Sequence, residues 1–273
     1  MTAHFARQSR IVSVTSGKGG VGKTSLAVNL AVALSRMGRR TLLADCDLGM
    51  ANAAIMMGFN SVVTIDDVLA GRLSVDEVVS EVHDGLFLLP GGSGIGNLPE
   101  FGSEARNRLA LGLRPFSRMT DFILVDTPTG ISPAAMEMVS AADAVVLVLS
   151  EEPTAFMDTY ATAKALALDH GCRNFGVIAN MVVNDAAGRS LFARFQDIVS
   201  RFLPASIDLL GSVPADRHMR DAVLHKKACV LAYPHSPSAM AIARIAARLG
   251  DLDISAAPGG NRFLAQEASH GVR

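Results

Sequence analysis

The sequence predicts an α/β fold: a single doubly wound, mostly parallel β-sheet that is flanked by helices. Three observations support this prediction. Apolar runs of strand length alternate with segments of helical periodicity along most of the chain. A glycine-rich loop joins the first apolar run to the first helical segment. Acidic and polar residues follow several of the apolar runs, at the strand ends where ligands bind in open parallel sheets.

The first predicted unit is a strand at residues 11–14, a glycine-rich loop and a helix that begins near residue 25. Glycines let such a loop turn tightly and aim its backbone N–H groups inward, and the helix N-terminus adds unpaired N–H groups. This is the pattern of a phosphate-binding loop of P-loop NTPases. The residues expected to bind nucleotide there are Gly17, Lys18, Gly19, Gly20, Val21, Gly22, Lys23, Thr24 and Ser25.

This loop contains two lysines, whereas the general phosphate-binding-loop pattern requires only one, Lys23. Lys23 is expected to reach the β- and γ-phosphates, and the hydroxyl of Thr24 to ligate Mg²⁺. Lys18 follows the first glycine and is expected to point away from the site that Lys23 serves. It is either an incidental surface lysine or a cation that reaches nucleotide held by a second copy of the protein.

The rest of the chain continues the alternation of strands and helices. With no repeat or linker visible, residues 1–250 are predicted to form one domain. Residues 251–273, which Pro258, Gly259 and Gly260 interrupt, are predicted to be a flexible tail. Further strands are predicted at 41–44, 86–89, 122–125, 144–149, 175–178 and 207–211, and helices at 52–57, 65–70, 104–117, 133–141, 154–169, 189–202, 219–224 and 238–249.

Three aspartates follow predicted strands and suit a magnesium site. Asp126 comes after four apolar residues, as expected of a carboxylate that holds Mg²⁺ through a water. Asp45 and Asp47 alternate along the chain, so that one can face the metal while the other faces an attacking water. We assign Thr24, Asp45 and Asp126 to the metal and the orienting role to Asp47, with Lys23 as a further catalytic residue and Lys18 as a catalytic candidate if it reaches the nucleotide of a second copy. Ordinary turn-forming aspartates are the alternative.

Asn180, Pro214 and Asp216 are candidates for contact with the nucleobase. An amide that follows a buried strand, as Asn180 does here, can both donate to and accept from the edge of a base. Pro214 and Asp216 follow the next strand at the equivalent place and are expected to close over the base. Asparagine at a strand end more often forms a turn, which is the competing interpretation.

Composition excludes several classes of protein. The formal net charge of −1 argues against an overall basic footprint for nucleic acid but allows a local patch. The three cysteines have no metal-type spacing and suit a reducing compartment. The apolar run at 144–149 is too short to span a bilayer, and residues 1–10 lack an apolar signal core. We therefore expect a soluble, cytoplasmic protein.

Three motifs resemble those of the MinD/ParA family of P-loop ATPases. Residues 18–24 are similar to its deviant Walker A loop, residues 45–49 to its second acidic motif, and residues 126–128 to the end of its Walker B motif. The resemblance spans residues 10–249. Residues 152–161, 164–166, 48–52 and 130–132 look most like the FlhG (FleN) branch of the family, which regulates flagellar number and placement.

The resemblance implies an ATP-dependent homodimer in which Lys18 crosses to the phosphates of the partner and Asp47 positions the hydrolytic water. Slow, partner-regulated hydrolysis of ATP to ADP, with Mg²⁺, then drives a conformational cycle. The implied partners are an FlhF-type GTPase, flagellar switch components or a flagellar transcriptional activator. FlhG proteins often carry a glutamine-containing N-terminal helix and a basic amphipathic C-terminal helix, and neither is evident here. Stimulation of FlhF, membrane association and a position at the inner membrane or cell pole therefore stay open.

Other members of the same family offer alternative functions. A ParA-type partition ATPase would hold DNA non-specifically through basic residues on a dimer face. A MinD-like ATPase would act at the division site and bind anionic lipid through its tail. Recognition of a specific nucleic-acid sequence is not expected.

Overall fold

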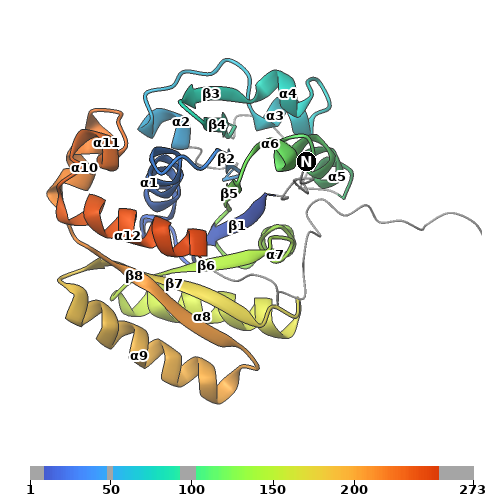
Figure 1. The fold of residues 1–273 in the computed structure, drawn as a ribbon. Coiled ribbons are helices and arrows are strands. Elements are labelled where there is room, and N and C mark those ends of the chain that lie inside the picture. The colour runs from blue at the N-terminus through green and yellow to red at the C-terminus, as the bar shows by residue number, and fades with distance from the viewer. Residues whose placement is uncertain (1–8, 48–51, 93–102, 252–273) are drawn as a thin grey trace, which may run out of the picture.

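The computed structural model describes residues 9–47, 52–92 and 103–251 of the 273-residue chain. Their centre is one eight-stranded sheet with the order β3-β4-β2-β5-β1-β6-β7-β8, in which every neighbouring pair is parallel except β3 and β4 (Figure 1). This confirms the predicted α/β fold. The strands are β1 Arg10–Thr15, β2 Thr41–Asp45, β3 Ser80–His83, β4 Leu86–Leu89, β5 Phe122–Asp126, β6 Ala144–Leu149, β7 Asn174–Val182 and β8 Ser206–Pro214.

Helices cover both faces of the sheet. Neighbouring residues of a strand point to opposite faces, so Val12 packs in the cluster with α1 and α12, whereas Ile11 packs in the cluster with α3 and α5. A third cluster joins α7, α8 and α9 to strands β6 and β7. The helices are α1 Lys23–Arg36, α2 Ala53–Met56, α3 Ile65–Leu69, α4 Val75–Val78, α5 Ser103–Leu113, α6 Phe116–Met119, α7 Pro133–Ser140, α8 Pro153–Leu168, α9 Asp185–Phe202, α10 Arg217–Leu224, α11 Cys229–Ala232 and α12 Pro237–Asp251.

Several elements differ from the sequence-based expectation. The helix expected at 104–117 is two helices, α5 and α6, separated at Pro115, because proline cannot donate the hydrogen bond that would continue a helix. The edge strand β3 and the one-turn helices α4 and α11 were not predicted. Strand β7 extends to Val182, so Asn180 lies inside this strand rather than after it. Helix α12 includes Asp251, which the sequence had assigned to the tail.

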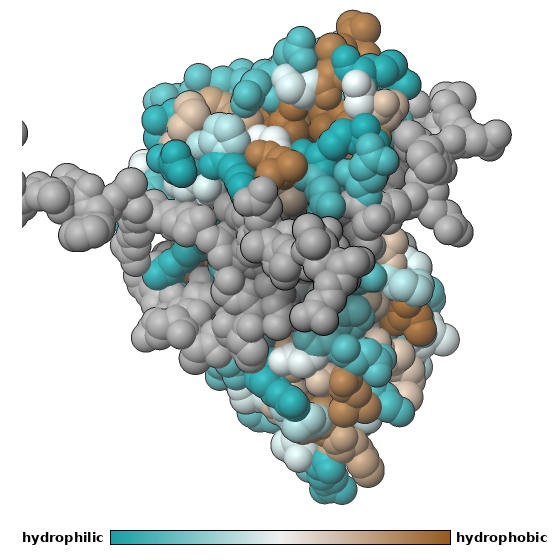
Figure 2. Space-filling view, turned by 90° about the vertical axis from the view of Figure 1, so that its right-hand side faces the viewer, coloured by the Kyte–Doolittle hydropathy of each residue, from teal (hydrophilic) through white to brown (hydrophobic). Residues whose placement is uncertain are grey.

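Some predicted features lie outside the described residues. These are the tail from 252 onward, residues 1–8, most of the glycine-rich segment 91–102, and residues 48–51 after the second acidic motif. Within the described part of the chain, no helix is long and apolar enough to cross a membrane. On the face shown in Figure 2, hydrophobic residues appear in small areas separated by hydrophilic ones.

Candidate nucleotide-binding site

The loop between β1 and α1 has the backbone that a phosphate-binding loop requires. Gly20 and Gly22 adopt φ angles of 83° and 86°, a left-handed conformation that residues with a Cβ rarely adopt. Gly22 is the N-cap residue of α1, and its carbonyl oxygen accepts the first helical hydrogen bond, from the Leu26 N–H, at 2.9 Å. The N-terminal N–H groups of α1 are therefore directed at the space enclosed by the loop.

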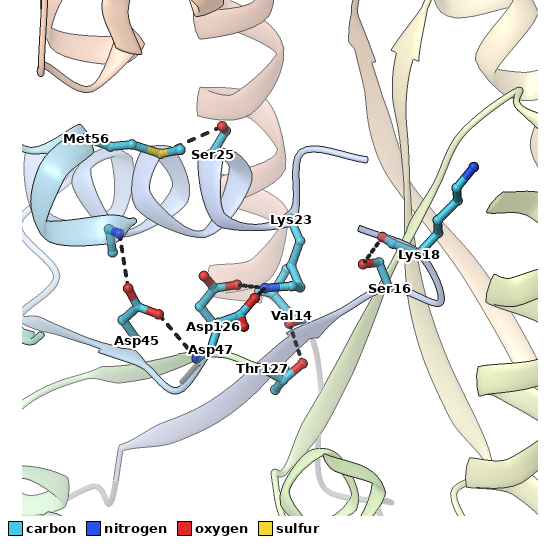
Figure 3. A network of polar contacts seen from close by, with 11 residues as sticks. Val14, Ser16, Lys18, Lys23, Ser25, Asp45, Asp47, Met56, Asp126 and Thr127 are labelled. Atoms are coloured by element: carbon cyan, nitrogen blue, oxygen red, sulfur yellow. Dashed lines mark hydrogen bonds and ion pairs between the residues drawn. The ribbon is translucent and has the colours of Figure 1, made fainter. Parts of the chain in front are cut away.

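Lys23 lies inside the protein and joins the ends of two neighbouring strands. Its ammonium is 2.7 Å from Oδ1 of Asp126, at the end of β5, and 3.3 Å from Oδ2 of Asp47, which follows β2 (Figure 3). The side chains of Lys23 and Asp126 are 4% and 0% exposed. The structure thus brings together three of the residues that the sequence singled out.

The carboxyl group of Asp126 is fully buried. Burial raises the pKa of its carboxyl, whereas the ammonium of Lys23 and a hydrogen bond from the hydroxyl of Thr24 lower it. The net direction is upward. Its second oxygen, Oδ2, is buried and has no hydrogen-bond partner in the described part of the protein. A buried carboxylate oxygen of this kind calls for a cation or an ordered water.

Asp45 is fully buried at the end of β2, beside Asp126 in the register of β2 and β5. Burial and the negative charge of Asp126 raise the pKa of Asp45 from 3.8 to about 7. Its two oxygens accept the backbone N–H groups of Ala53, at 3.0 Å, and Asp47, at 3.3 Å. These hydrogen bonds connect the metal candidate Asp45 to the start of α2.

These residues fit a magnesium–nucleotide complex. Mg²⁺ keeps several waters and takes one or two carboxylates together with phosphate oxygens, so it does not need a dense cluster of protein ligands. Among the described residues no group of three or more His, Cys, Asp or Glu side chains is arranged to hold a metal. The unpaired oxygen of Asp126, the adjacent hydroxyl of Thr24 and the buried ammonium of Lys23 match this mode of binding.

Lys18 points away from Lys23, as the sequence predicted (Figure 3). Its ammonium forms an ion pair with the carboxylate of Glu152 and lies 2.9 Å from the hydroxyl oxygen of Thr154. Glu152 is the N-cap residue of α8. Sequence reasoning did not identify either contact, because residues 18 and 152 are brought together only by the packing of the loop against α8.

Asn180 touches the loop itself. Its side-chain Nδ2 donates to the carbonyl oxygen of Val21 at 2.7 Å, and the side chain is buried. A Cβ added to Gly22 would lie 2.5 Å from the same nitrogen, which shows how closely the amide and the loop approach. Contact of Asn180 with a nucleobase stays a prediction, and its demonstrated partner is the loop.

Pro214 and Asp216 lie at the end of β8 and the start of α10. Asp216 caps α10 by accepting the His218 N–H at 3.0 Å, and it also accepts the N–H and the hydroxyl of Ser238 at the start of α12. Burial disfavours the ionised carboxylate of Asp216 and so raises its pKa. These hydrogen bonds favour the ionised form and outweigh burial, so the net shift of the pKa is downward. Both carboxylate oxygens are therefore used within the protein, and closure of Pro214 and Asp216 over a base also stays a prediction.

Ser25, on α1, contacts the sulfur of Met56 at 3.8 Å.

The geometry described above agrees with the comparison of the chain with known proteins. Residues 12–229 match the model of the CobQ/CobB/MinD/ParA nucleotide-binding domain. The chain belongs to this family.

Relatives within the CobQ/CobB/MinD/ParA family include an antiactivator and a protein named for the flagellum. The antiactivator FleN of Pseudomonas aeruginosa is 36% identical over 252 residues, which cover 92% of this chain and 90% of FleN. The flagellum site-determining protein YlxH of Helicobacter pylori is 31% identical over 244 residues, which cover 88% of this chain and 82% of YlxH.

Solved structures of the family share the fold. The cell-division ATPase MinD of Pyrococcus furiosus has a TM-score of 0.73 at 28% identity, with 90% of this chain and 100% of that chain covered. The septum site-determining protein MinD of Pyrococcus horikoshii, solved with Mg-ADP, has a TM-score of 0.72 at 30% identity, with 88% and 96% covered.

Proposed function

We propose that this family member is a Mg²⁺-dependent ATPase that dimerises with ATP and acts as a nucleotide switch regulating flagellar number or placement. The observation that supports it best is the opposite orientation of two lysines in one loop. Lys23 is buried against Asp126 and Asp47, whereas Lys18 is directed out of the site. Lys23 serves the nucleotide of its own chain, and Lys18 serves that of a second copy.

Mg²⁺, when bound with ATP, supplies charge neutralisation of the phosphates and a fixed geometry for phosphoryl transfer. The loop N–H groups and Lys23 hold the β- and γ-phosphates in place. Thr24, Asp45 and Asp126 hold the metal, directly or through water. Asp47 lies beside Lys23 at the same edge of the sheet, where its carboxylate can orient a water for attack.

The flagellar part of the proposal depends on the relatives. YlxH is named as a flagellum site-determining protein, and the chain matches both YlxH and the antiactivator FleN over more than four-fifths of their length. An FlhF-type GTPase, flagellar switch components or a flagellar transcriptional activator would read the ATP-bound dimer. In this proposal the protein acts in the cytoplasm, and such a partner recruits it to the inner membrane or cell pole.

A MinD-like role at the division site is the second candidate, because two MinD structures match the chain at 28% and 30% identity. Flagella counted by electron microscopy in a deletion strain distinguish the two. The flagellar function predicts cells with an altered number or position of flagella and normal division. Minicells with unchanged flagella would favour the division function. Complementation with wild-type protein, but not with Lys23→Ala, would link the phenotype to nucleotide binding.

The biochemical test uses the full chain. Light scattering should show a monomer without nucleotide and a dimer with ATP and Mg²⁺, and phosphate release should require Mg²⁺. A chain that stays monomeric with ATP while hydrolysing it at the same rate at all protein concentrations would refute the switch.

A further inference from the structure

Helix α10 and the turn after it carry a group of cations that the nucleotide site does not use. Arg217, Arg220 and Leu224 are exposed and follow one another at intervals of three and four residues, so they form one stripe along the helix. Lys226 and Lys227, both exposed, come directly after the helix end. We call these five residues the α10 patch. Within the described part of the chain, none of its four cations forms an ion pair.

The opposite side of α10 is packed on the protein. Ala222 is fully buried, and the sulfur of Met219 accepts a hydrogen bond from Nδ2 of Asn29, on α1, at 3.6 Å. Helices α2, α10 and α11 lie side by side along α1 (Figure 1). The α10 patch is therefore the outer face of an anchored helix, and its residues are held in place before any partner binds.

Two residues of the patch are costly for a surface that only meets water. The N–H groups of Lys226 and Lys227 donate to the carbonyl oxygens of Val223 and Ala222, both at 3.0 Å, which ends α10 in a Schellman turn. Lys226 has a φ angle of 52° in this turn, at the position where glycine is usual because a Cβ disfavours the left-handed conformation. Leu224 is 74% exposed, so most of its apolar side chain lies in water. A partner that covers the patch would use both side chains.

We infer that the α10 patch is a docking surface for an acidic segment of a partner protein, one that presents carboxylates beside an apolar anchor side chain. The formal net charge of the chain is −1, yet residues 217–232 contain four Arg or Lys side chains and one acidic side chain, that of Asp221. Leu224 lies among these cations and supplies the apolar contact. At 1.5 Å per residue the stripe from Arg217 to Leu224 is about 10 Å long, so about two turns of a partner helix would span it.

The exposed leucine favours this partner over other anionic ones. Duplex DNA is held through its phosphates by cations and polar groups, and the phosphate backbone offers no apolar partner to Leu224. A helix that lies on a bilayer buries a continuous apolar face in the lipid, whereas the stripe of α10 contains a single apolar side chain. A protein segment with one apolar anchor matches both the charge and the leucine.

Helix α2 connects the patch to the nucleotide site. It begins at Ala53, whose N–H donates to Asp45 at 3.0 Å. Beyond its other end, a Cβ added to Gly58 would lie 2.9 Å from the carbonyl oxygen of Lys226. A change at Asp45 on binding of Mg²⁺ and nucleotide would therefore reach the patch through one short helix. The docking surface stands on the patch alone, and its dependence on nucleotide rests on the proposed switch.

A synthetic peptide tests the docking surface. The probe is a fluorescein-labelled helical peptide with leucines at helical spacing and glutamates between them, and its control has glutamine in place of every glutamate. Fluorescence anisotropy with the full, nucleotide-free chain measures both dissociation constants at low and high salt. We expect the glutamate peptide to bind more tightly than the glutamine peptide, and this difference to shrink at high salt because salt screens exposed charges.

Variants of the patch locate the binding. Arg220→Gln should weaken binding of the glutamate peptide about two- to fivefold, as for one exposed charge pair, and Leu224→Ser about tenfold, as for a leucine buried on binding. Arg118→Gln and Leu111→Ser are the matched controls, because these residues are exposed on α6 and α5, at the opposite face of the sheet. Both controls should bind like the wild type.

Lys226→Gly separates binding from stability. Glycine suits the left-handed position, so the urea unfolding midpoint of this variant should be at least that of the wild type. Its affinity for the glutamate peptide should nevertheless fall about two- to fivefold, because a cation is lost. A wild-type affinity in this variant would remove Lys226 from the surface.

Several results would overturn the inference. These are equal binding of the two peptides, unchanged affinity in Arg220→Gln and Leu224→Ser, equal losses in the control variants, and tighter binding of duplex DNA or phosphatidylglycerol vesicles through the same residues. Repeating the titration with a non-hydrolysable ATP analogue and Mg²⁺ tests the connection through α2, which predicts a changed affinity for the peptide. An unchanged affinity in protein that binds the analogue would refute this connection. If the protein does not bind the analogue, the proposed function fails, and the nucleotide-free titration still decides the docking surface.

Discussion

The ammonium of Lys23 and the carboxylate of Asp126 form a buried ion pair, with 2.7 Å between Nζ and Oδ1. The pair joins the start of α1 to the end of β5, so it supports the fold as well as the site. Removing the lysine alone would leave a buried carboxylate without its counter-charge, which is more costly than losing a surface pair. The two lysines of the loop therefore differ in their importance for stability.

Lys23→Met should destabilise the nucleotide-free protein by roughly 3 kcal/mol, because Asp126 must then be buried unpaired or protonated. Urea unfolding followed by circular dichroism measures this change. Lys18→Met is the matched control, since it removes the same charge from the same loop at an exposed position. Its unfolding midpoint should stay close to that of the wild type. Equal destabilisation by the two variants would contradict the assignment of Lys23 to a buried ion pair.

Asp47→Ala and Lys18→Ala should separate hydrolysis from dimerisation. Asp47→Ala is expected to abolish phosphate release and to preserve ATP-dependent dimers in light scattering, because Asp47 is assigned to the water and not to the interface. Lys18→Ala is expected to weaken dimerisation more than nucleotide affinity of the monomer, measured by fluorescent-nucleotide titration. A monomeric Asp47→Ala, or equal losses in Lys18→Ala, would contradict these roles.

The strand–loop–helix unit and the acidic strand ends were predictable because each depends on local sequence. Neighbouring residues alone encode the turn at the loop glycines, the strand before the loop and the strand that ends at Asp126. Residue partners distant in sequence were not predictable in the same way. The meeting of Lys18 with Glu152 depends on how closely Gly17 packs on α8, and the capping of two helices by Asp216 depends on the approach of α10 and α12.

The short polar strand β3 was missed for a different reason. Its residues alternate between half-buried and exposed positions, and none is a strongly apolar anchor except Val82. Its partner β4 pairs with it in the antiparallel direction and supplies the backbone hydrogen bonds. Pairing with a neighbour, which no local pattern encodes, decides that this segment is a strand.

The raised pKa of Asp45 gives a pH dependence with a defined sign. Its carboxyl titrates at about 7 in the folded protein against 3.8 ordinarily, so between these values the folded state binds more protons than the unfolded chain. The free energy of unfolding should therefore fall as the pH rises from about 4 to 7 and then level off. Asp45→Asn lacks this proton, so its stability should fall less over that range. Thermal unfolding at pH 5 to 8, without nucleotide or Mg²⁺, measures how steeply the stability of the wild type and of Asp45→Asn falls with pH. Parallel curves would show that Asp45 does not titrate in this range.

Asn180→Ala distinguishes a residue that reads the base from one that only supports the loop. The change removes the donor to the buried carbonyl oxygen of Val21, so the loop should be less well ordered and ATP affinity should fall about tenfold, as expected for one lost buried hydrogen bond. If Asn180 also contacts the base, ATP affinity should fall more than GTP affinity, and the preference between them should shrink. Isothermal titration of both nucleotides with wild type and variant measures this directly, and the comparison of two nucleotides in one variant is its own control. We expect the preference for ATP to shrink. Equal losses for ATP and GTP would restrict Asn180 to supporting the loop through Val21.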